Sequence, residues 1–289
     1  MTFVLARKFG ERIVILSDTM ITHHPDQRKN DVIPGQLKSV VLSLNMSVAF
    51  CGSVVTALDT IRSCKNRIQQ GHGREYVVSI IREASLSGCD FILASHIDGA
   101  KLIKIVEGSA TEPQGVHWLG NPDILKKIQH QQGVFDEGFQ NVLRSNPGLE
   151  DHRTEESNFT RSFSHLLLCD PMVAEDVGGF ATNLLASPYG HCYQTFAGAY
   201  SPGPITIGGS NDTERPTGGG DRYAYNFTSP SYRGIAIAGI FMDQAKVGYI
   251  YDPLCCDEAI KVPNTTEQGI IEMLNARAKA RGGKPEAQC

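Results

Sequence analysis

Short apolar runs bounded by turn residues alternate along this chain with two pairs of segments that have helical periodicity. Such runs predict strands, whereas apolar residues three and four positions apart predict helices. The expected strands cover 2–9, 12–17, 37–44, 47–51, 90–95, 101–106, a run ending at 120, 180–186 and 192–197, and the expected helices cover 54–69, 74–87, 123–144 and 156–168. This order predicts an α+β fold, a four-layer α/β/β/α sandwich of two antiparallel sheets with helices on the outer faces.

The C-terminal part of the chain extends beyond this pattern. We expect the sandwich to cover 2–200 and an extension to cover 201–280, with a hairpin around Asp243-Gln244 and a helix over 266–280. Residues 281–289 are expected to form a disordered tail. The sequence leaves open whether the extension bridges neighbouring subunits or adds to the sandwich.

The composition argues against several classes of partner. The net charge is -4 and there is no long basic run, so we expect no nucleic-acid partner, because phosphate neutralisation needs clustered lysine and arginine. No apolar stretch approaches the roughly 20 residues that span a bilayer, and no signal peptide is recognised, so we expect a cytoplasmic protein without a membrane partner. The eight cysteines are scattered without metal-type spacing, and we expect neither a metal nor another cofactor.

Thr2 is a candidate nucleophile because of its position. If Met1 is removed, Thr2 carries both a hydroxyl and a free α-amine, which places a nucleophile and a base on one residue. An α-amine titrates at roughly 7.7–8.0 and can accept the hydroxyl proton at neutral pH. Threonine is also a common second residue, and for Thr2 taken alone this second interpretation is preferred.

Four features of the first 60 residues occur together in an order that is found in one family. They are Thr2, a strand pair that ends in Ser17-Asp18-Thr19, a strand that begins Leu37-Lys38-Ser39-Val40, and Ala49-Phe50-Cys51-Gly52-Ser53 at the start of a helix. With a separation of sixteen residues between Thr2 and Asp18, this combination resembles the proteasome β-subunit family of N-terminal-nucleophile (Ntn) hydrolases, which includes bacterial proteasome-like proteases. The resemblance covers about residues 2–200 and is sharpest over 2–60.

The resemblance implies the chemistry of a threonine peptidase. The Thr2 hydroxyl would attack a peptide carbonyl, with the Thr2 α-amine as proton acceptor. Lys38 would lower the cost of forming the alkoxide, Asp18 would hold Lys38 in place, and the backbone N–H of Gly52 would stabilise the oxyanion. Each residue also has a structural interpretation: Asp18 as a turn residue, Lys38 as a solvated charge and Gly52 as a loop residue. Their joint order and spacing favour the catalytic interpretation.

Five further residues are assigned by the same resemblance. Asn121, in Gly120-Asn121-Pro122, corresponds to the family's Gly-Ser-Gly turn. Asp176 or its neighbour Glu175, before Gly178-Gly179, would serve as the acid of the family's Asp-x-x-Ser-Gly-Gly motif, while Val177 cannot replace the serine hydroxyl. Phe50 would lie at the base of the pocket for the substrate side chain, with Val40 and Val54 on its walls. Such a pocket would favour small or medium apolar side chains. The alternative is that Phe50 points into the core.

Three functions remain open at this point. The first is a threonine endopeptidase that acts on peptides or unfolded proteins within a self-compartmentalised homo-oligomer, with an ATP-dependent unfoldase as a further partner that the resemblance allows. The second is an Ntn amidohydrolase that acts on a small amide. The third is a non-catalytic, proteasome-like structural subunit. The size of the oligomer separates the first from the second, and reactivity of Thr2 separates both from the third.

Overall fold

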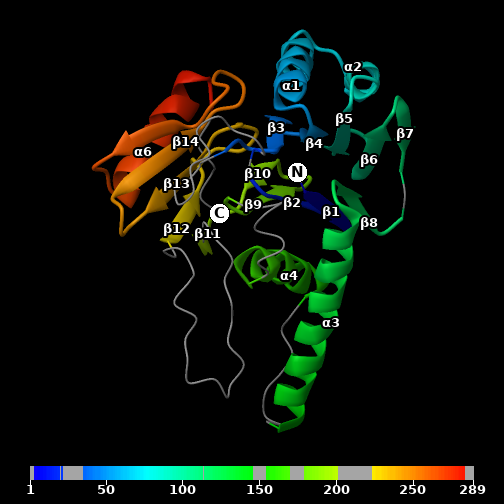
Figure 1. Cartoon of the computed structure of the whole chain (residues 1–289). Helices are drawn as coiled ribbons and strands as arrows, with labels where there is room; N and C mark the ends of the chain where they lie inside the picture. The colour runs from blue at the N-terminus through cyan, green and yellow to red at the C-terminus, as the bar shows by residue number, and fades with distance from the viewer. Residues whose placement is uncertain are drawn as a thin grey trace.

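The computed structural model describes residues 3–19, 21, 35–112, 114–145, 154–169, 179–200 and 223–283. Three antiparallel sheets of five strands each and five helices are present in these ranges. The α+β class predicted from the sequence is therefore confirmed. Two of the sheets and four of the helices come from the first 193 residues, and the third sheet and the last helix lie beside them (Figure 1).

The first sheet contains the N-terminal hairpin, and its strand order is β10-β9-β2-β1-β8. Its strands are β1 (Val4–Phe9), β2 (Arg12–Ser17), β8 (Val116–Leu119), β9 (Thr182–Ala186) and β10 (Cys192–Tyr193). Gly10, with a φ of 60°, makes the turn between β1 and β2, where few other residues are comfortable. The predicted hairpin over 2–17 is thus confirmed within the described residues.

The second sheet is a meander with the strand order β3-β4-β5-β6-β7. Its strands are β3 (Ser39–Ser43), β4 (Met46–Gly52), β5 (Cys89–Ser95), β6 (Lys101–Val106) and β7 (Ser109–Thr111). Asp98 and Gly99, with φ values of 59° and 94°, connect β5 to β6. Two successive residues with positive φ form the turn that matches the twist of a hairpin, as the Asp-Gly pair predicts.

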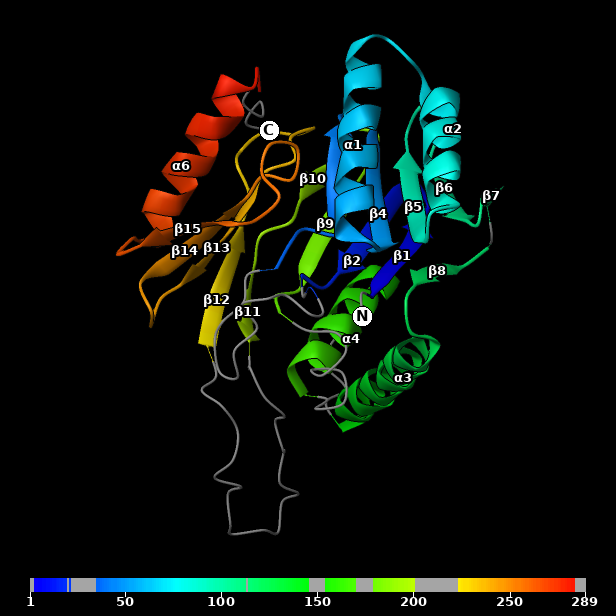
Figure 2. The same ribbon diagram turned by 45° about the horizontal axis from the view of Figure 1, so that its top comes forward.

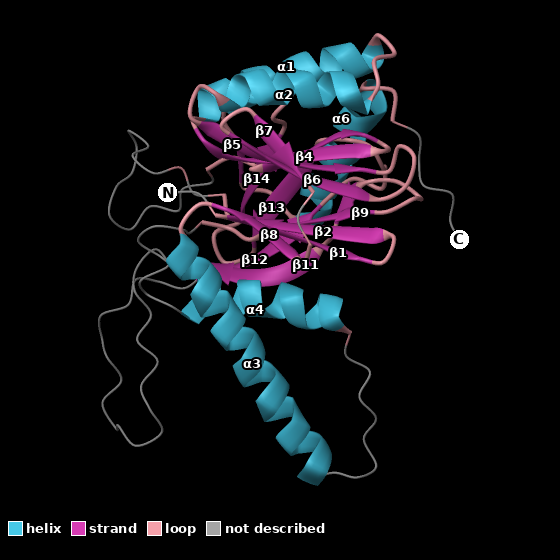
Figure 3. Ribbon diagram, turned by 90° about the vertical axis from the view of Figure 1, so that its right-hand side faces the viewer, coloured by secondary structure: helices cyan, strands magenta, loops and turns pink. Residues whose placement is uncertain are grey.

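Two pairs of helices cover the outer faces of these sheets. They are α1 (Val54–Gln69) and α2 (Arg74–Ser85) against the second sheet, and α3 (Pro122–Ser145) and α4 (Glu155–Cys169) against the first. Figure 3 shows α1 and α2 above the stacked sheets and α3 and α4 below them, with the far end of α3 extending away from the body. Among the described helices, none combines the length and the apolar composition needed to cross a membrane.

Side chains that alternate between the two faces of the strands contribute to two hydrophobic cores. Val4 and Ala6 of β1 face the second sheet, whereas Leu5 of β1 faces the opposite way and packs with Ile128 of α3 and Phe163 of α4. Successive side chains of a strand point to opposite faces, so a fully apolar strand can serve both cores. Burial of one such side chain stabilises the fold by about 1.5–3 kcal/mol.

The third sheet, with the strand order β11-β12-β13-β14-β15, differs from the prediction. Its strands are β11 (Phe196–Tyr200), β12 (Tyr223–Thr228), β13 (Ala238–Met242), β14 (Val247–Tyr251) and β15 (Ile260–Pro263). The hairpin around Asp243-Gln244 is confirmed as β13 and β14, and α6 (Glu267–Ala280) packs on this pair (Figure 2). The description of the chain as a sandwich of two sheets is wrong, because β11, β12 and β15 enlarge the predicted hairpin into a separate sheet.

The run 192–197, predicted as one strand paired with 180–186, is divided between two sheets. Cys192 and Tyr193 pair with β9, whereas Phe196 starts a strand that pairs with β12. The chain therefore passes from the first sheet to the third over Gln194 and Thr195. The predicted boundary of the core at residue 200 coincides with the last residue of β11, a strand that already belongs to the third sheet.

Candidate functional site

The structure brings together Asp18 and Lys38, two residues of the predicted site. Asp18 follows the last residue of β2, and Lys38 precedes the first residue of β3. The Lys38 Nζ lies 2.9 Å from Oδ1 and 2.8 Å from Oδ2 of Asp18, and both side chains are completely buried. This pair therefore joins the first sheet to the second at the ends of two strands.

The start of the described chain lies beside this pair. The backbone N–H of Phe3 donates to Asp18 Oδ1 at 3.1 Å, and the backbone N–H of Asp18 donates to the Phe3 carbonyl at 3.4 Å. Phe3 is the residue bonded to Thr2, and Thr2 itself lies outside the described residues. The Asp18 carboxylate thus holds both the Lys38 ammonium and the backbone of the residue that follows the predicted nucleophile.

Burial gives Lys38 an unusual proton affinity. The loss of hydration lowers the pKa of Lys38 below its ordinary value, whereas the charge and hydrogen bonds of Asp18 act in the opposite direction. Burial also raises the pKa of the neighbouring Cys51 thiol, which favours the neutral thiol, while Lys38 acts against this shift. A buried lysine with a lowered pKa beside a fixed carboxylate can supply a positive charge or exchange a proton.

A cluster of hydroxyl groups supports the two strand ends. Ser17 Oγ lies 2.6 Å from Thr182 Oγ1 and donates to Ser39 Oγ at 3.2 Å, and the Tyr193 hydroxyl donates to the Ser39 carbonyl at 2.9 Å. Ser17 directly precedes Asp18 and Ser39 directly follows Lys38, so the cluster fixes the backbone on which the ion pair depends. The serines next to Asp18 and Lys38 are visible in the sequence. Thr182 and Tyr193 come from β9 and β10, and no local signal indicates their approach.

Gly52 occupies the strand-to-helix turn that the resemblance assigns to it. It ends β4 with a φ of 113°, and a Cβ atom at this position would collide with the Gly88 carbonyl oxygen. Ser53 then caps α1, since its Oγ accepts the Thr56 N–H at 3.3 Å. Gly52 is exposed to solvent. Backbone conformation and space therefore both require glycine here, and the exposed turn leaves its backbone accessible.

The three residues predicted to form a substrate pocket lie mainly in the core. Phe50 and Val40 are completely buried in the apolar cluster that includes both of the first two sheets, and Val54 at the start of α1 is half-buried against it. The Phe50 N–H donates to the Lys38 carbonyl at 3.0 Å, which ties β4 to the segment that carries Lys38. A substrate side chain could reach Phe50 only by displacing core packing, so the role of these residues in specificity stays a prediction.

Asn121 and Asp176 are not joined to the ion pair by the structure. Asn121 Oδ1 accepts the Asp123 N–H at 2.8 Å, which caps the first turn of α3. Asp176 lies outside the described residues. The described part of the site therefore consists of Asp18, Lys38 and the exposed Gly52 turn.

A second chain of polar side chains, which sequence reasoning missed, links Ser47, His191 and His96. Ser47 Oγ lies 2.8 Å from His191 Nδ1, His191 Nε2 lies 2.8 Å from His96 Nδ1, and His96 Nε2 lies 2.8 Å from the Glu11 carbonyl. A carbonyl only accepts, so His96 Nε2 carries hydrogen. In the neutral chain His191 Nε2 then donates to His96, and Ser47 donates to His191. Ser47 and His191 are completely buried. A substrate has no access to Ser47, and the chain joins β4, β5 and the turn before β10 internally.

This buried histidine predicts a loss of stability in acid. Burial, followed by the neighbouring His96, lowers the pKa of His191 to about 3. Below pH 6.5 or so, which is about the ordinary pKa of histidine, the unfolded chain binds a proton that the folded chain does not bind. The free energy of unfolding should therefore decrease as the pH is lowered, by up to about 1.4 kcal/mol per pH unit from this group. The loss should occur between pH 6.5 and pH 3, as far as the protein stays folded.

Urea titrations at several pH values between about 4.5 and 7.5 measure this slope. A His191→Asn variant is the comparison, because asparagine keeps a polar group at the site and does not titrate. We expect a weaker dependence on pH in the variant than in the unmodified protein. Identical slopes for the two proteins would show that His191 is not the group responsible.

Comparisons of the whole sequence give no further assignment of this site: the chain matches no protein-family model and no curated protein sequence.

Proposed function

We propose that this chain is an Ntn hydrolase of the threonine peptidase type, with Thr2 as nucleophile and Lys38 and Asp18 as its electrostatic support. The observation that carries the proposal is the buried Lys38–Asp18 pair, whose carboxylate also accepts the N–H of Phe3. A fully buried ion pair requires desolvation of two charges and is weak evidence for a purely stabilising role. Its place beside the residue bonded to Thr2 gives it a catalytic use.

The mechanism assigns one task to each group. The Thr2 hydroxyl adds to the amide carbonyl carbon while its proton passes to the Thr2 α-amine, and the Lys38 ammonium favours the developing alkoxide. The N–H of Gly52 donates to the oxyanion of the tetrahedral intermediate. The C–N bond then breaks, the leaving amine takes the proton, and an ester on Thr2 remains. Water hydrolyses this ester by the same route and regenerates the hydroxyl.

The stacking of the first two sheets between two helix pairs also supports this proposal, because the resemblance implies the same four layers. The third sheet and α6 then form an addition to an Ntn core. We further propose the assembly that the resemblance implies, a cytoplasmic homo-oligomer that encloses its sites and acts on peptides or unfolded proteins. An ATP-dependent unfoldase is a partner of the same proposal.

Intact mass spectrometry after incubation with a peptide boronate or epoxyketone tests the nucleophile. We expect a protein that has lost Met1 and that gains the mass of one inhibitor per chain. Thr2→Ser should still react, because serine offers the same hydroxyl and amine, whereas Thr2→Ala should gain no mass and should lose peptide hydrolysis. Hydrolysis by the Thr2→Ala protein at the unmodified rate would exclude the assignment.

The two alternatives give different results in the same experiments. An amidohydrolase for small amides would react at Thr2 but would not need a ring that hides its sites, so light scattering would give a small oligomer. A non-catalytic subunit would form an assembly without any adduct.

Fluorogenic peptides that differ only at the cleaved residue would test the Phe50, Val40 and Val54 pocket, and preference for arginine or aspartate at the cleaved residue would contradict an apolar pocket.

A further inference from the structure

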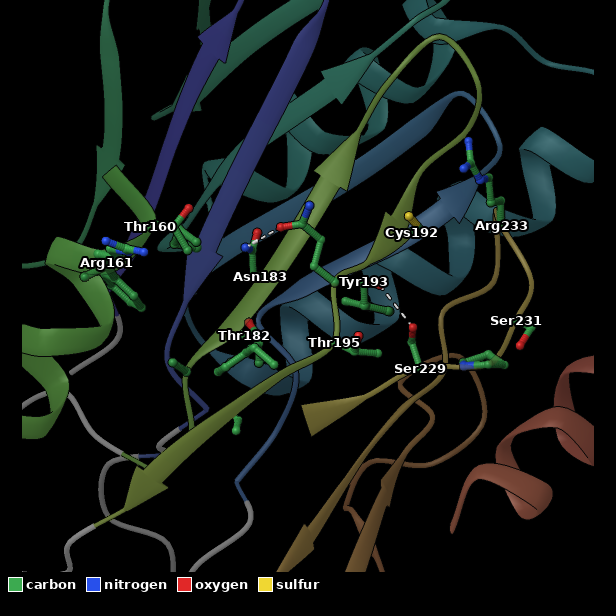
Figure 4. Close-up of a pocket in the computed structure, with 17 residues that line it drawn as sticks. Thr160, Arg161, Thr182, Asn183, Cys192, Tyr193, Thr195, Ser229, Ser231 and Arg233 are labelled. Atoms are coloured by element: carbon green, nitrogen blue, oxygen red, sulfur yellow. Dashed lines mark hydrogen bonds between the residues drawn. The ribbon is translucent and has the colours of Figure 1, made fainter. Parts of the chain in front are cut away.

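A cavity of about 940 Å³ lies between the first sheet, α4 and the start of the third sheet. Its lining includes Thr182 and Tyr193, which also support the strand ends that carry Asp18 and Lys38. It is lined by residues of α4, by the continuous run 192–197 and by the turn that follows β12 (Figure 4). Its apolar wall includes Leu16, Phe163 and Ala181, which belong to the cluster on the α4 side of the first sheet. A cavity of this size can hold a ligand as large as a short peptide.

The described lining of the cavity carries positive charge. Among the described residues that line it, the charged ones are Arg161 of α4 and Arg233, and none is acidic. Figure 4 shows these two arginines on opposite sides of the cavity, Arg161 from α4 and Arg233 beyond Cys192. Arg161 is exposed, and Arg233 is anchored by its donation to the Tyr189 carbonyl at 3.0 Å. In a chain of net charge -4, this lining selects for an anionic ligand.

Two amide side chains in the wall form a donor and acceptor pair. Asn183 Nδ2 donates to Gln194 Oε1 at 2.6 Å, which leaves the Asn183 Oδ1 acceptor and the Gln194 Nε2 donor for other partners. Asn183 is buried, and its Oδ1 has no hydrogen-bond partner among the described residues. A buried acceptor without a partner lowers stability, and an N–H group of a ligand can remove this cost. One residue of an extended peptide offers both the required N–H and a carbonyl for Gln194, because these two groups of the same residue point to the same side of the chain.

The backbone along the cavity belongs to two sheet edges. β10 is an edge strand of the first sheet, and β11 is an edge strand of the third. β10 lies within the lining run 192–197, and β11 begins in it. In the described part of the chain, neither strand has a neighbour on its outer side. Extended peptides bind to such edges through main-chain hydrogen bonds.

We propose that this cavity binds a short acidic peptide. The peptide lies extended along the run 192–197, the N–H and C=O of one of its residues pair with Asn183 and Gln194, and a carboxylate of the peptide pairs with Arg161. Arginine is suited to this role because its planar guanidinium matches a carboxylate with two parallel hydrogen bonds. Binding at this site does not require the proposed peptidase activity.

Isothermal titration calorimetry tests the proposal with a defined probe. The probe is an N-acetylated tetrapeptide of alternating alanine and glutamate with a free C-terminus. The comparison peptide has glutamine in place of glutamate and an amidated C-terminus. The Thr2→Ala protein is used so that the probe stays intact. We expect the acidic peptide to bind, and the neutral peptide to bind at least about tenfold more weakly, because charge-assisted hydrogen bonds are lost.

Variants locate the binding to the cavity. Arg161→Gln and Gln194→Leu should each weaken binding of the acidic peptide by about tenfold or more. Arg161 is exposed and Gln194 half-buried, so both variants should fold, and circular dichroism checks this. The matched control is Arg144→Gln, an exposed arginine on α3 that does not line the cavity. Absence of binding at millimolar concentration, equal binding of both peptides, or unchanged binding by Arg161→Gln would each overturn the proposal.

Discussion

Replacement of Lys38 by methionine should lower the free energy of unfolding by about 3–5 kcal/mol, which is the cost of leaving one charge of a buried pair without its partner. Asp18 is completely buried, and its carboxylate receives both the Lys38 ammonium and the Phe3 N–H. Methionine keeps the length and most of the packing of lysine, so loss of the charge accounts for the effect. Urea denaturation of the single variant measures it.

A double variant separates this charge effect from packing. Asp18→Asn combined with Lys38→Met removes both charges, while asparagine still offers an oxygen to the Phe3 N–H. We expect the double variant to be more stable than Lys38→Met alone, and the difference from additivity gives the coupling energy of the pair. Lys261→Met is the control, because Lys261 is exposed on β15 and its replacement should change stability by no more than about 0.5 kcal/mol.

The same variants distinguish stability from catalysis. If Lys38 supports the alkoxide of Thr2, the double variant should regain stability without regaining hydrolysis. A purely structural ion pair would instead allow activity to return with stability. Full kcat in Lys38→Met at a temperature where it is folded would show that the positive charge of Lys38 is not needed.

Local patterns were sufficient to predict much of the fold. The helical spacing of apolar residues over 54–69 predicts α1 with the bounds that the structure gives, and Leu58 and Ile61 of this pattern are buried. The apolar runs on either side of Asp98-Gly99 predict β5, β6 and the turn between them. In these cases the residues that determine the element lie within it or beside it.

Long-range pairing explains what the sequence did not predict. Phe196 of β11 pairs with Phe227 of β12, and Ile250 of β14 pairs with Ile260 of the short strand β15. Neither pair of strands is joined by a two-residue hairpin turn, so the sequence indicates a simple hairpin where the structure has a sheet. The alternation of apolar residues within each strand is the same in both arrangements, and only tertiary contacts distinguish them.

The candidate site, like the fold, could be predicted from the sequence only in part. Asp18 and Lys38 could be predicted as partners because the order and spacing of the N-terminal motifs resemble those of a known family. Thr182 and Tyr193 reach the site from β9 and β10, and His191 meets Ser47 through a separation of 144 residues. Such approaches depend on how whole sheets stack, and a motif search over neighbouring residues cannot find them.

A protein with one additional, non-removable residue before Thr2 should fold and assemble yet hydrolyse peptides about 10²–10⁴-fold more slowly, the contribution usual for a positioned general base. The extra residue converts the Thr2 α-amine into an amide nitrogen, which cannot accept a proton. Asp18, Lys38 and Gly52 stay in place, so the change isolates the amine from the rest of the site. Peptide hydrolysis is measured alongside the size of the assembly.

Release of Thr2 from this blocked protein provides the control within one molecule. Cleavage by a specific protease directly before Thr2 should restore hydrolysis, and the rate should rise with pH through the range of about 7.7–8.0 in which an α-amine titrates. The Lys38→Met variant, blocked and freed in the same way, should gain little from release because its alkoxide lacks support. Equal hydrolysis by the blocked and freed forms of the unmodified site would exclude an N-terminal threonine mechanism. It would leave the buried Asp18–Lys38 pair as a structural link between the two sheets, because the pair would then have no nucleophile to serve.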